Sequence, residues 1–165
     1  MPAQPNIRRL IVLLLGLTLS GCGFRLAGTS ALPPALSRIH LVTVDFNQQQ
    51  RNALSRRLRQ AGAEVLAQPA GDAVELRVIL RILPDRRVVT SASDGKAVER
   101  LARGLDYSLK DSDGNLLAPA RSLNQQKDIE LDQDNLLSSD QERRNVEKDL
   151  ESALFNQLMR QLERI

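Results

Sequence analysis

Polar and apolar residues alternate along several stretches of the chain, and this period of two is typical of β-strands. The clearest case is residues 73–83, where every second side chain is aliphatic: Val74, Leu76, Val78, Leu80 and Ile82. Residues 39–46 are β-rich and mostly apolar, which predicts a strand in the centre of a sheet, and further strands are predicted at residues 64–66, 97–110 and 116–131. Pro84 interrupts the first of these stretches, which predicts a bulge or a sheet edge there, with the strand resuming at residues 88–90.

Two other stretches repeat their apolar residues at helical spacing. Residues 48–61 place Leu54, Leu58 and Ala61 on one stripe, and Gly62 suits the position just after a helix. The arginines of this segment are expected largely in solvent: Arg51, Arg56, Arg57 and Arg59. Residues 138–165 predict a longer helix, in which Ser139 and Glu142 have the spacing of a capping box.

Turn residues connect these elements. Asp-Gly within Ser93–Lys96 predicts one hairpin turn and Asp111–Asn115 a second, and Pro119 marks the last strand as an edge candidate. The order β-α-β-β-β-β-α predicts an α+β fold with two helices packed on one face of a mixed, mostly antiparallel sheet with long strands. Because aromatic residues make up only 2% of the chain, the core is expected to consist of Leu, Val, Ile and Ala.

The first 21 residues have the organisation of a bacterial lipoprotein signal. Arg8 and Arg9 precede an apolar stretch of about ten residues, which is too short to span a bilayer as a helix. Leu19-Ser20-Gly21-Cys22 then matches the lipobox, so Cys22 is expected to carry S-diacylglycerol and N-palmitoyl groups that anchor the chain in a membrane. The alternative is an ordinary secretory signal followed by a buried cysteine.

This interpretation divides the chain into three parts: a signal peptide at 1–21, a lipidated tether at 22–37 and a single α+β domain at 38–165. Gly23 stands where related lipoproteins kept in the inner membrane often have Asp. We therefore expect export to the outer membrane, with the domain on its periplasmic side.

The composition argues against several classes of function. The formal charge of +3 falls to +1 once Arg8 and Arg9 leave with the signal, and no basic run is interleaved with aromatic residues, so no nucleic-acid partner is expected. Cys22 and His40 are the only residues of their kinds, and His40 lies in an apolar strand, which leaves no catalytic constellation, metal site or cofactor site to predict. Asp111–Asn115 loosely resembles a calcium loop, but a hairpin turn is the favoured interpretation. Acidic residues alternate from Asp128 to Asp134, and a solvated or partner-facing edge is favoured there over a cation site.

The mature chain resembles the LptE family of lipopolysaccharide-assembly lipoproteins. The family pattern Gly-Cys-Gly-(Phe/Trp)-x-Leu-(Arg/Ala)-Gly matches residues 21–28. Further similarities follow in order: the Arg-rich helix ending at Gly62, the long hairpin, Leu109-Lys110-Asp111, Lys127-Asp128 ahead of residues 134–137, and the end of the last helix at 157–162.

This resemblance implies a non-enzymatic protein that plugs the β-barrel LptD, assists its assembly and helps to insert lipopolysaccharide into the outer leaflet. Basic residues that the family uses near the hairpin tip and the last helix align with Ser93 and Ser139 here, so Lys96 and Arg100 beside the tip are the candidate lipopolysaccharide-binding residues. The alternative function is an auxiliary lipoprotein subunit of another envelope lipid-transport or barrel-assembly complex.

Overall fold

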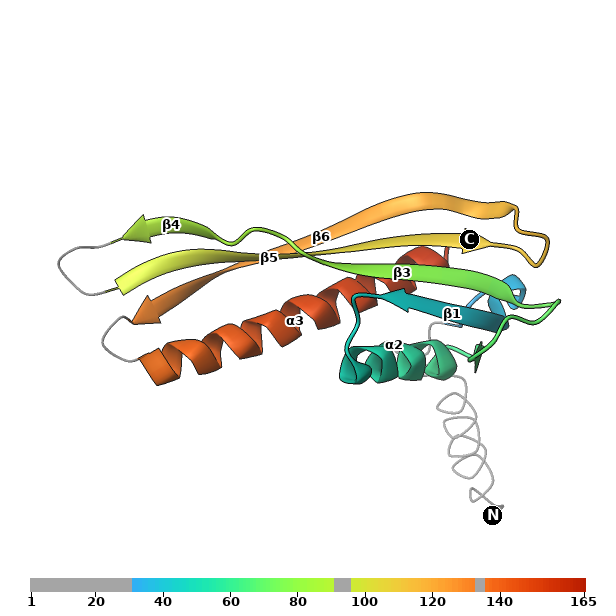
Figure 1. The fold of residues 1–165 in the computed structure, drawn as a ribbon, viewed down its shortest axis with the longest axis horizontal. Coiled ribbons are helices and arrows are strands. Elements are labelled where there is room, and N and C mark those ends of the chain that lie inside the picture. Colours follow the sequence, from blue (N-terminus) through green and yellow to red (C-terminus); the bar gives the residue numbers. More distant parts are fainter. Residues whose placement is uncertain (1–30, 91–95, 133–135) are drawn as a thin grey trace, which may run out of the picture.

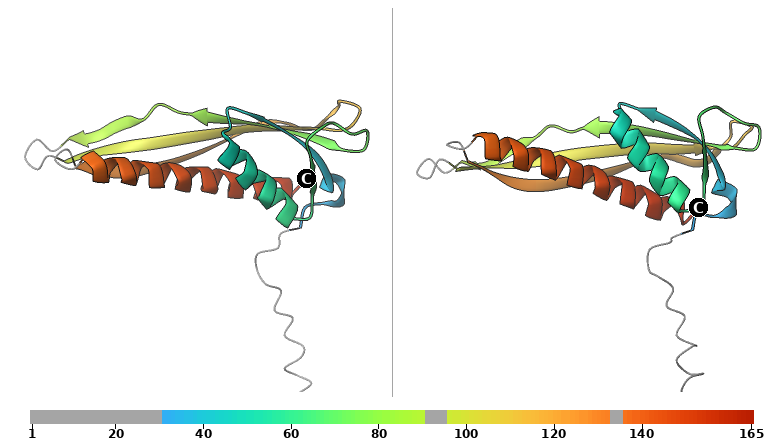
Figure 2. Two further views of the ribbon diagram at one scale, coloured as in Figure 1. Left: turned by 60° about the horizontal axis from the view of Figure 1, so that its bottom comes forward. Right: turned by 90° about the horizontal axis from the view of Figure 1, so that it is seen from below.

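One six-stranded sheet and two α-helices on a single face of it make up the described part of the chain (Figures 1 and 2). The computed structural model describes residues 31–90, 96–132 and 136–165, with the backbone alone at residues 88–90, 96–97, 131–132 and 136. After a short 3₁₀ turn at Pro34–Leu36, the elements are β1 (Arg38–Val44), α2 (Gln48–Gln60), β2 (Glu64–Leu66), β3 (Val74–Ile82), β4 (Arg86–Thr90), β5 (Lys96–Lys110), β6 (Leu116–Asp132) and α3 (Leu136–Leu162). The predicted α+β class is confirmed.

The sheet is mixed, because β1 runs parallel to both β2 and β3 while every other pairing is antiparallel. The strand order is β2-β1-β3-β5-β4, and β6 pairs with β5 on its other side. β3 and β4 share one edge of the long β5 in tandem, since β3 pairs with residues 103–110 and β4 with residues 97–100. Pro84 lies in the gap between them, and β6 is an edge strand, as Pro119 indicated.

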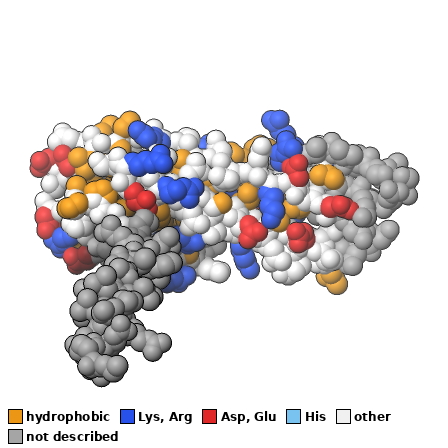
Figure 3. All heavy atoms as spheres, turned by 180° about the vertical axis from the view of Figure 1, so that it is seen from behind, with side chains coloured by type: hydrophobic (Ala, Val, Ile, Leu, Met, Phe, Trp, Pro, Cys, Tyr) orange, Lys and Arg blue, Asp and Glu red, His pale blue; other side chains and the backbone are white. Residues whose placement is uncertain are grey.

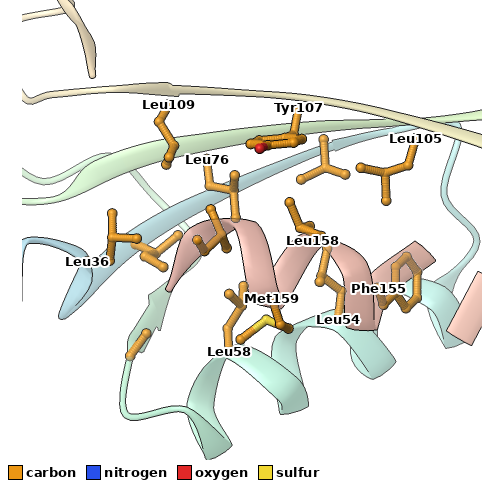
Figure 4. Packing of buried hydrophobic residues seen from close by; sticks show 14 of the residues in the cluster. Leu36, Leu54, Leu58, Leu76, Leu105, Tyr107, Leu109, Phe155, Leu158 and Met159 are labelled. Atoms are coloured by element: carbon orange, nitrogen blue, oxygen red, sulfur yellow. The ribbon is translucent and has the colours of Figure 1, made fainter. Parts of the chain in front are cut away.

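The main core lies between the sheet and the two helices (Figure 4). Leu76 of β3 and Leu105 and Leu109 of β5 point toward Leu54 of α2 and Leu158 of α3, and all five are fully buried. The core also uses most of the few aromatic residues, which the composition had not led us to expect: Phe46, Tyr107 and Phe155. The rings of Phe46 and Phe155 stack with centroids 5.8 Å apart.

Beyond this core, one end of the molecule extends as an arm (Figure 1). We define the arm as residues 86–90, 96–103, 125–132 and 136–150, that is, β4, the adjoining halves of β5 and β6, and the first half of α3. Among the side chains that the structure describes there, a separate apolar cluster contains Leu101, Ile129, Val146 and Leu150. Within the described side chains, this cluster is much smaller than the main core and contributes less hydrophobic stabilisation.

The ends of the helices agree only in part with the predictions. Asn47 caps α2, accepting a hydrogen bond from the Gln50 backbone while the Gln50 side chain accepts one from the Asn47 backbone. Gly62 follows α2 with φ of +95°, as predicted. The predicted capping box of α3 is wrong, because Leu136 and Leu137 are already helical and place Ser139 inside the first turn.

The turn between β5 and β6 is the second predicted hairpin. Asp111 Oδ1 accepts hydrogen bonds from the backbone N–H groups of Asp113 and Asn115, at 3.0 and 2.8 Å, and Gly114 takes φ of +86°. Hydrogen bonds from Asn115 are the main reason why the pKa of Asp111 lies below its ordinary value. The carboxylate thus organises the turn itself.

Candidate anion-binding hollow on the open face of the sheet

Polar side chains contact one another on the face of the sheet opposite the helices. Arg81 Nε lies 2.8 Å from Asp106 Oδ2, and the Ser122 hydroxyl donates to Asp106 at 2.6 Å. Arg81 reaches across Gly104, where an added Cβ would lie 3.1 Å from Arg81 Nη2 and 3.0 Å from Asn124 Oδ1. Glycine at this point lets a long side chain lie flat on the sheet, so the open face is a fixed polar surface.

A row of charged residues crosses the arm on this face. Arg86 of β4, Arg100 of β5 and Asp128 of β6 stand directly opposite one another in the strand register, which places their side chains on the same face. Arg100 donates to both oxygens of Asp128, with Nε–Oδ1 of 2.6 Å and Nη2–Oδ2 of 2.8 Å. This hydrogen bonding lowers the pKa of Asp128 and raises that of Arg100.

Next to this row lies a hollow of about 400 Å³ at the break between β3 and β4. Its lining combines apolar and cationic groups: Leu83, Pro84, Arg86, Arg100, Ala102 and Gln126. Arg86 is exposed and forms no ion pair within the described residues, whereas Asp128 neutralises Arg100. A free guanidinium beside an apolar floor suits a ligand that has both an anionic group and hydrocarbon, such as a lipid phosphate.

A charged network on the helix side holds the wall of this hollow in place. The guanidinium of Arg103, which is only 7% exposed, lies 2.7 Å from Glu147 of α3 and 3.2 Å from Asp85. Asp85 follows Pro84 directly and also lies 3.2 Å from Arg143 of α3, which in turn pairs with Glu99 of β5. The β3–β4 connection is therefore tied to both β5 and α3 by charge-assisted contacts.

Arg57 departs from its prediction. Arg51, Arg56 and Arg59 are exposed as expected, but Arg57 is half-buried because α3 passes beside it. Its guanidinium donates to Ser152 Oγ at 2.9 Å and lies 5.5 Å from the centre of the Phe155 ring. The solvent-facing prediction for this residue is wrong, since a helical stripe does not reveal where a second helix crosses.

The predicted site residues fall in different parts of the structure. Arg100 lines the hollow, and Lys96 lies four residues earlier on β5, where the structure describes its backbone alone. Cys22, the Ser93–Gly95 part of the first predicted turn, and Asp134 lie outside the described residues. The sequence analysis did not identify Arg86 as a candidate. The feature of the sequence that could have indicated it is the pair of arginines shortly after Pro84.

Seen from behind, acidic and basic side chains are interspersed along the molecule, and hydrophobic ones gather mainly near one end (Figure 3). A binding site for an anion would therefore require a local grouping of arginines. In the part of the chain that the structure describes, no three His, Cys, Asp or Glu residues are placed to bind a metal ion. No helix within the described ranges is long and apolar enough to cross a membrane.

The chain was compared with known proteins. It is 29% identical over 157 residues to an LPS-assembly lipoprotein LptE from Photorhabdus laumondii subsp. laumondii, covering 93% of this chain and 80% of the relative. Among solved structures, lipoprotein B from Nitrosomonas europaea has a TM-score of 0.68 at 19% identity, covering 86% of this chain and 90% of that one. The rare lipoprotein B from Shewanella oneidensis gives 0.64 at 13% identity, with coverage of 76% and 92%, and these two structures support the fold.

The model of one protein family, LptE (lipopolysaccharide-assembly), matches residues 36–162, from the 3₁₀ turn to the last residue of α3. This match includes both helices, all six strands and the hollow. The chain therefore belongs to the LptE family.

Proposed function

We propose that this chain is a non-enzymatic outer-membrane lipoprotein of lipopolysaccharide assembly. The observation that carries the proposal is the family match across the whole described domain. Residues 1–21 would be removed as a signal peptide, Cys22 would hold the lipid, and residues 22–37 would connect it to the domain at 38–165. The name of the Photorhabdus relative supports the same role.

The partner that we propose is an LptD-like β-barrel, with the domain acting as a plug that also assists barrel assembly. The lumen of an outer-membrane barrel is polar, so a plug must present polar groups to it. The open face of the sheet has this character, because Arg81, Asp106 and Asn124 form a fixed polar surface there. The narrow arm gives the domain an elongated shape that is compatible with insertion along a barrel axis (Figure 2).

Co-purification tests this partnership. The tagged, lipidated chain would be extracted from outer membranes in mild detergent, and the molar ratio of bound proteins measured. We expect an LptD-like barrel in a one-to-one complex. Recovery of a different envelope transporter or of the barrel-assembly machinery in its place would contradict the proposal.

We further propose that lipopolysaccharide binds at the hollow, so that it is inserted into the outer leaflet with help from this domain. Lys96 and Arg100 remain the candidates from sequence, and Arg86 joins them because it is the cation of the hollow without a carboxylate partner in the described residues. Lipid A phosphates would bind the arginines, and its acyl chains would contact Leu83 and Pro84.

Binding of purified lipopolysaccharide to single variants tests this site. Arg86→Gln is expected to weaken binding by about tenfold, the effect of losing one charge-assisted contact. Arg100→Ala and Lys96→Ala should weaken binding as well. Arg77→Gln is the matched control, since Arg77 is an exposed arginine of β3 that does not line the hollow. Equal losses for Arg77→Gln and Arg86→Gln would show that only overall charge matters.

A further inference from the structure

Helix α2 concentrates positive charge, because it contains four arginines and no acidic residue. Three of these arginines lie in solvent, but Arg57 is wedged between α2 and α3. Every polar partner of Arg57 is neutral: Ser152 Oγ at 2.9 Å, Asn156 Oδ1 at 3.3 Å and the Ala53 carbonyl at 3.5 Å. The guanidinium also lies over the Phe155 ring, but no carboxylate pairs with its charge.

This lack of a counter-ion sets Arg57 apart within the described residues. The other arginines that are partly or fully buried there are Arg38, Arg81, Arg100, Arg103 and Arg143, and each has a carboxylate within ion-pair distance. Burial, together with the neighbouring charge of Arg56, lowers the pKa of Arg57. A partly desolvated cation without an anion is unfavourable, and an incoming anion would relieve this cost.

The geometry also leaves room for such an anion. A guanidinium has five N–H donors, and the three contacts of Arg57 use one on each nitrogen, so one donor remains on Nη1 and one on Nη2. Arg57 lines a hollow of about 330 Å³ between the C-terminal ends of α2 and α3, next to Gln60, Asn156 and the exposed Arg160. Ala61 and Met159 supply apolar lining, and Glu163 lies at the same hollow.

We infer that this hollow between α2 and α3 binds the carboxylate of an Asp or Glu side chain from a partner protein. The charged residues that line the hollow are Arg57, Arg160 and Glu163, so the lining has one net positive charge. This charge matches a single carboxylate better than a doubly charged phosphate. Arg57 and Arg160 both line the hollow, and each guanidinium can donate a charge-assisted hydrogen bond to a carboxylate oxygen. The exposed Arg56 and Arg59 would attract an acidic segment toward the hollow.

This site is on the helix side of the sheet, opposite the proposed lipopolysaccharide hollow, and does not depend on that proposal. The test uses the full lipidated chain in detergent micelles and a fluorescent peptide of alternating glutamate and alanine, with a glutamine–alanine peptide as the neutral probe. Fluorescence anisotropy gives the two affinities. We expect the acidic peptide to bind and the neutral peptide to bind at least about tenfold more weakly, because it lacks the charge-assisted contacts.

Variants then locate the binding. Arg57→Gln should weaken the acidic peptide by about tenfold or more, and the exposed neighbour Arg56→Gln by no more than about threefold. Arg57→Lys keeps the charge without the forked geometry and should fall between them. Arg160→Gln changes an exposed residue of the same hollow, so its expected several-fold loss tests the site even where an Arg57 variant folds poorly.

Three results would overturn the inference. The first is no preference for the acidic peptide. The second is an equal loss for Arg56→Gln and Arg57→Gln, which would indicate nonspecific attraction to a basic helix. The third is Arg57-dependent binding to phosphatidylglycerol vesicles that the acidic peptide does not compete away, which would assign the hollow to a lipid headgroup.

Discussion

Replacing Arg103 with methionine should destabilise the arm far more than a surface substitution would. The guanidinium is 7% exposed and contacts Glu147 at 2.7 Å and Asp85 at 3.2 Å. Methionine preserves most of the packing volume but removes the charge and the donors. Asp85 retains Arg143, at 3.2 Å, whereas Glu147 loses its ion-pair partner while one third exposed.

The size of the effect follows from that unpaired carboxylate. Removing one member of a buried ion pair costs about 3–5 kcal/mol, and the partial exposure of Glu147 reduces this to about 2–3 kcal/mol. The four described apolar residues of the arm's separate cluster contribute about 6–12 kcal/mol by their burial, so this loss is a sizeable fraction of that stabilisation. We expect the first half of α3 to open locally before the body of the domain unfolds.

Urea denaturation and amide hydrogen exchange measure the two consequences. Arg103→Met should lower the free energy of unfolding by about 2–3 kcal/mol and speed exchange between Val146 and Leu150, with less effect in β3. The double variant Arg103→Met/Glu147→Leu should recover most of this loss, because no unpaired charge remains at Glu147. If Arg103→Met is as stable as the unchanged protein, or if the double variant is the less stable of the two, the reasoning about buried charge is refuted.

Three other predictions concern single positions. Gly62→Ala should lower the free energy of unfolding by about 1 kcal/mol in urea denaturation, because φ of +95° strains any residue with a Cβ; an unchanged value would contradict the αL termination of α2. Gly104→Val should cost about 1–3 kcal/mol by displacing Arg81 from the open face, and a crystal structure showing Arg81 still beside Asp106 would contradict this. Burial raises the pKa of Glu151 above its ordinary value of 4.5, although the carboxylate accepts a 2.5 Å hydrogen bond from Gln50. The folded protein therefore loses stability as pH rises from 4.5 through this raised pKa. Glu151→Gln removes this loss, so the stability of the variant relative to the unchanged protein should rise with pH across that window, and a flat difference would be inconsistent with the raised pKa.

The elements that could be predicted from the sequence are those that depend on residues close together in the chain. The alternation from Val74 to Ile82, the Asp111–Asn115 turn and the glycine after α2 all reflect backbone preferences that act over a few residues. The mixed sheet and the placement of both helices on one face followed from these elements and their order. Ser139 shows the limit of such reasoning, because a capping pattern can also occur inside the first turn of a helix that begins earlier.

The candidate sites depend on contacts between distant parts of the chain, which a single sequence does not specify. Arg86 and Arg100 come together only through the register of β4 against β5, and the three-residue connection between β3 and β4 sets that register no more firmly than its alternatives. Arg57 is half-buried because α3 crosses α2 about 95 residues later in the chain, as its bond to Ser152 records. The ion pair between Arg100 and Asp128 likewise joins two distant strands. It leaves Arg86 as the cation of the hollow that has no carboxylate partner in the described residues.

The role that we propose for this member of the LptE family is lipopolysaccharide delivery to the cell surface. The most direct measurement is the fraction of newly made lipopolysaccharide that reaches the outer leaflet when the chain is depleted from its own bacterium, scored by surface labelling. We expect surface arrival to fall while lipopolysaccharide accumulates in membranes behind the outer leaflet, and we expect re-expression to restore it. Unchanged surface arrival after complete depletion would show that the protein does not have this role.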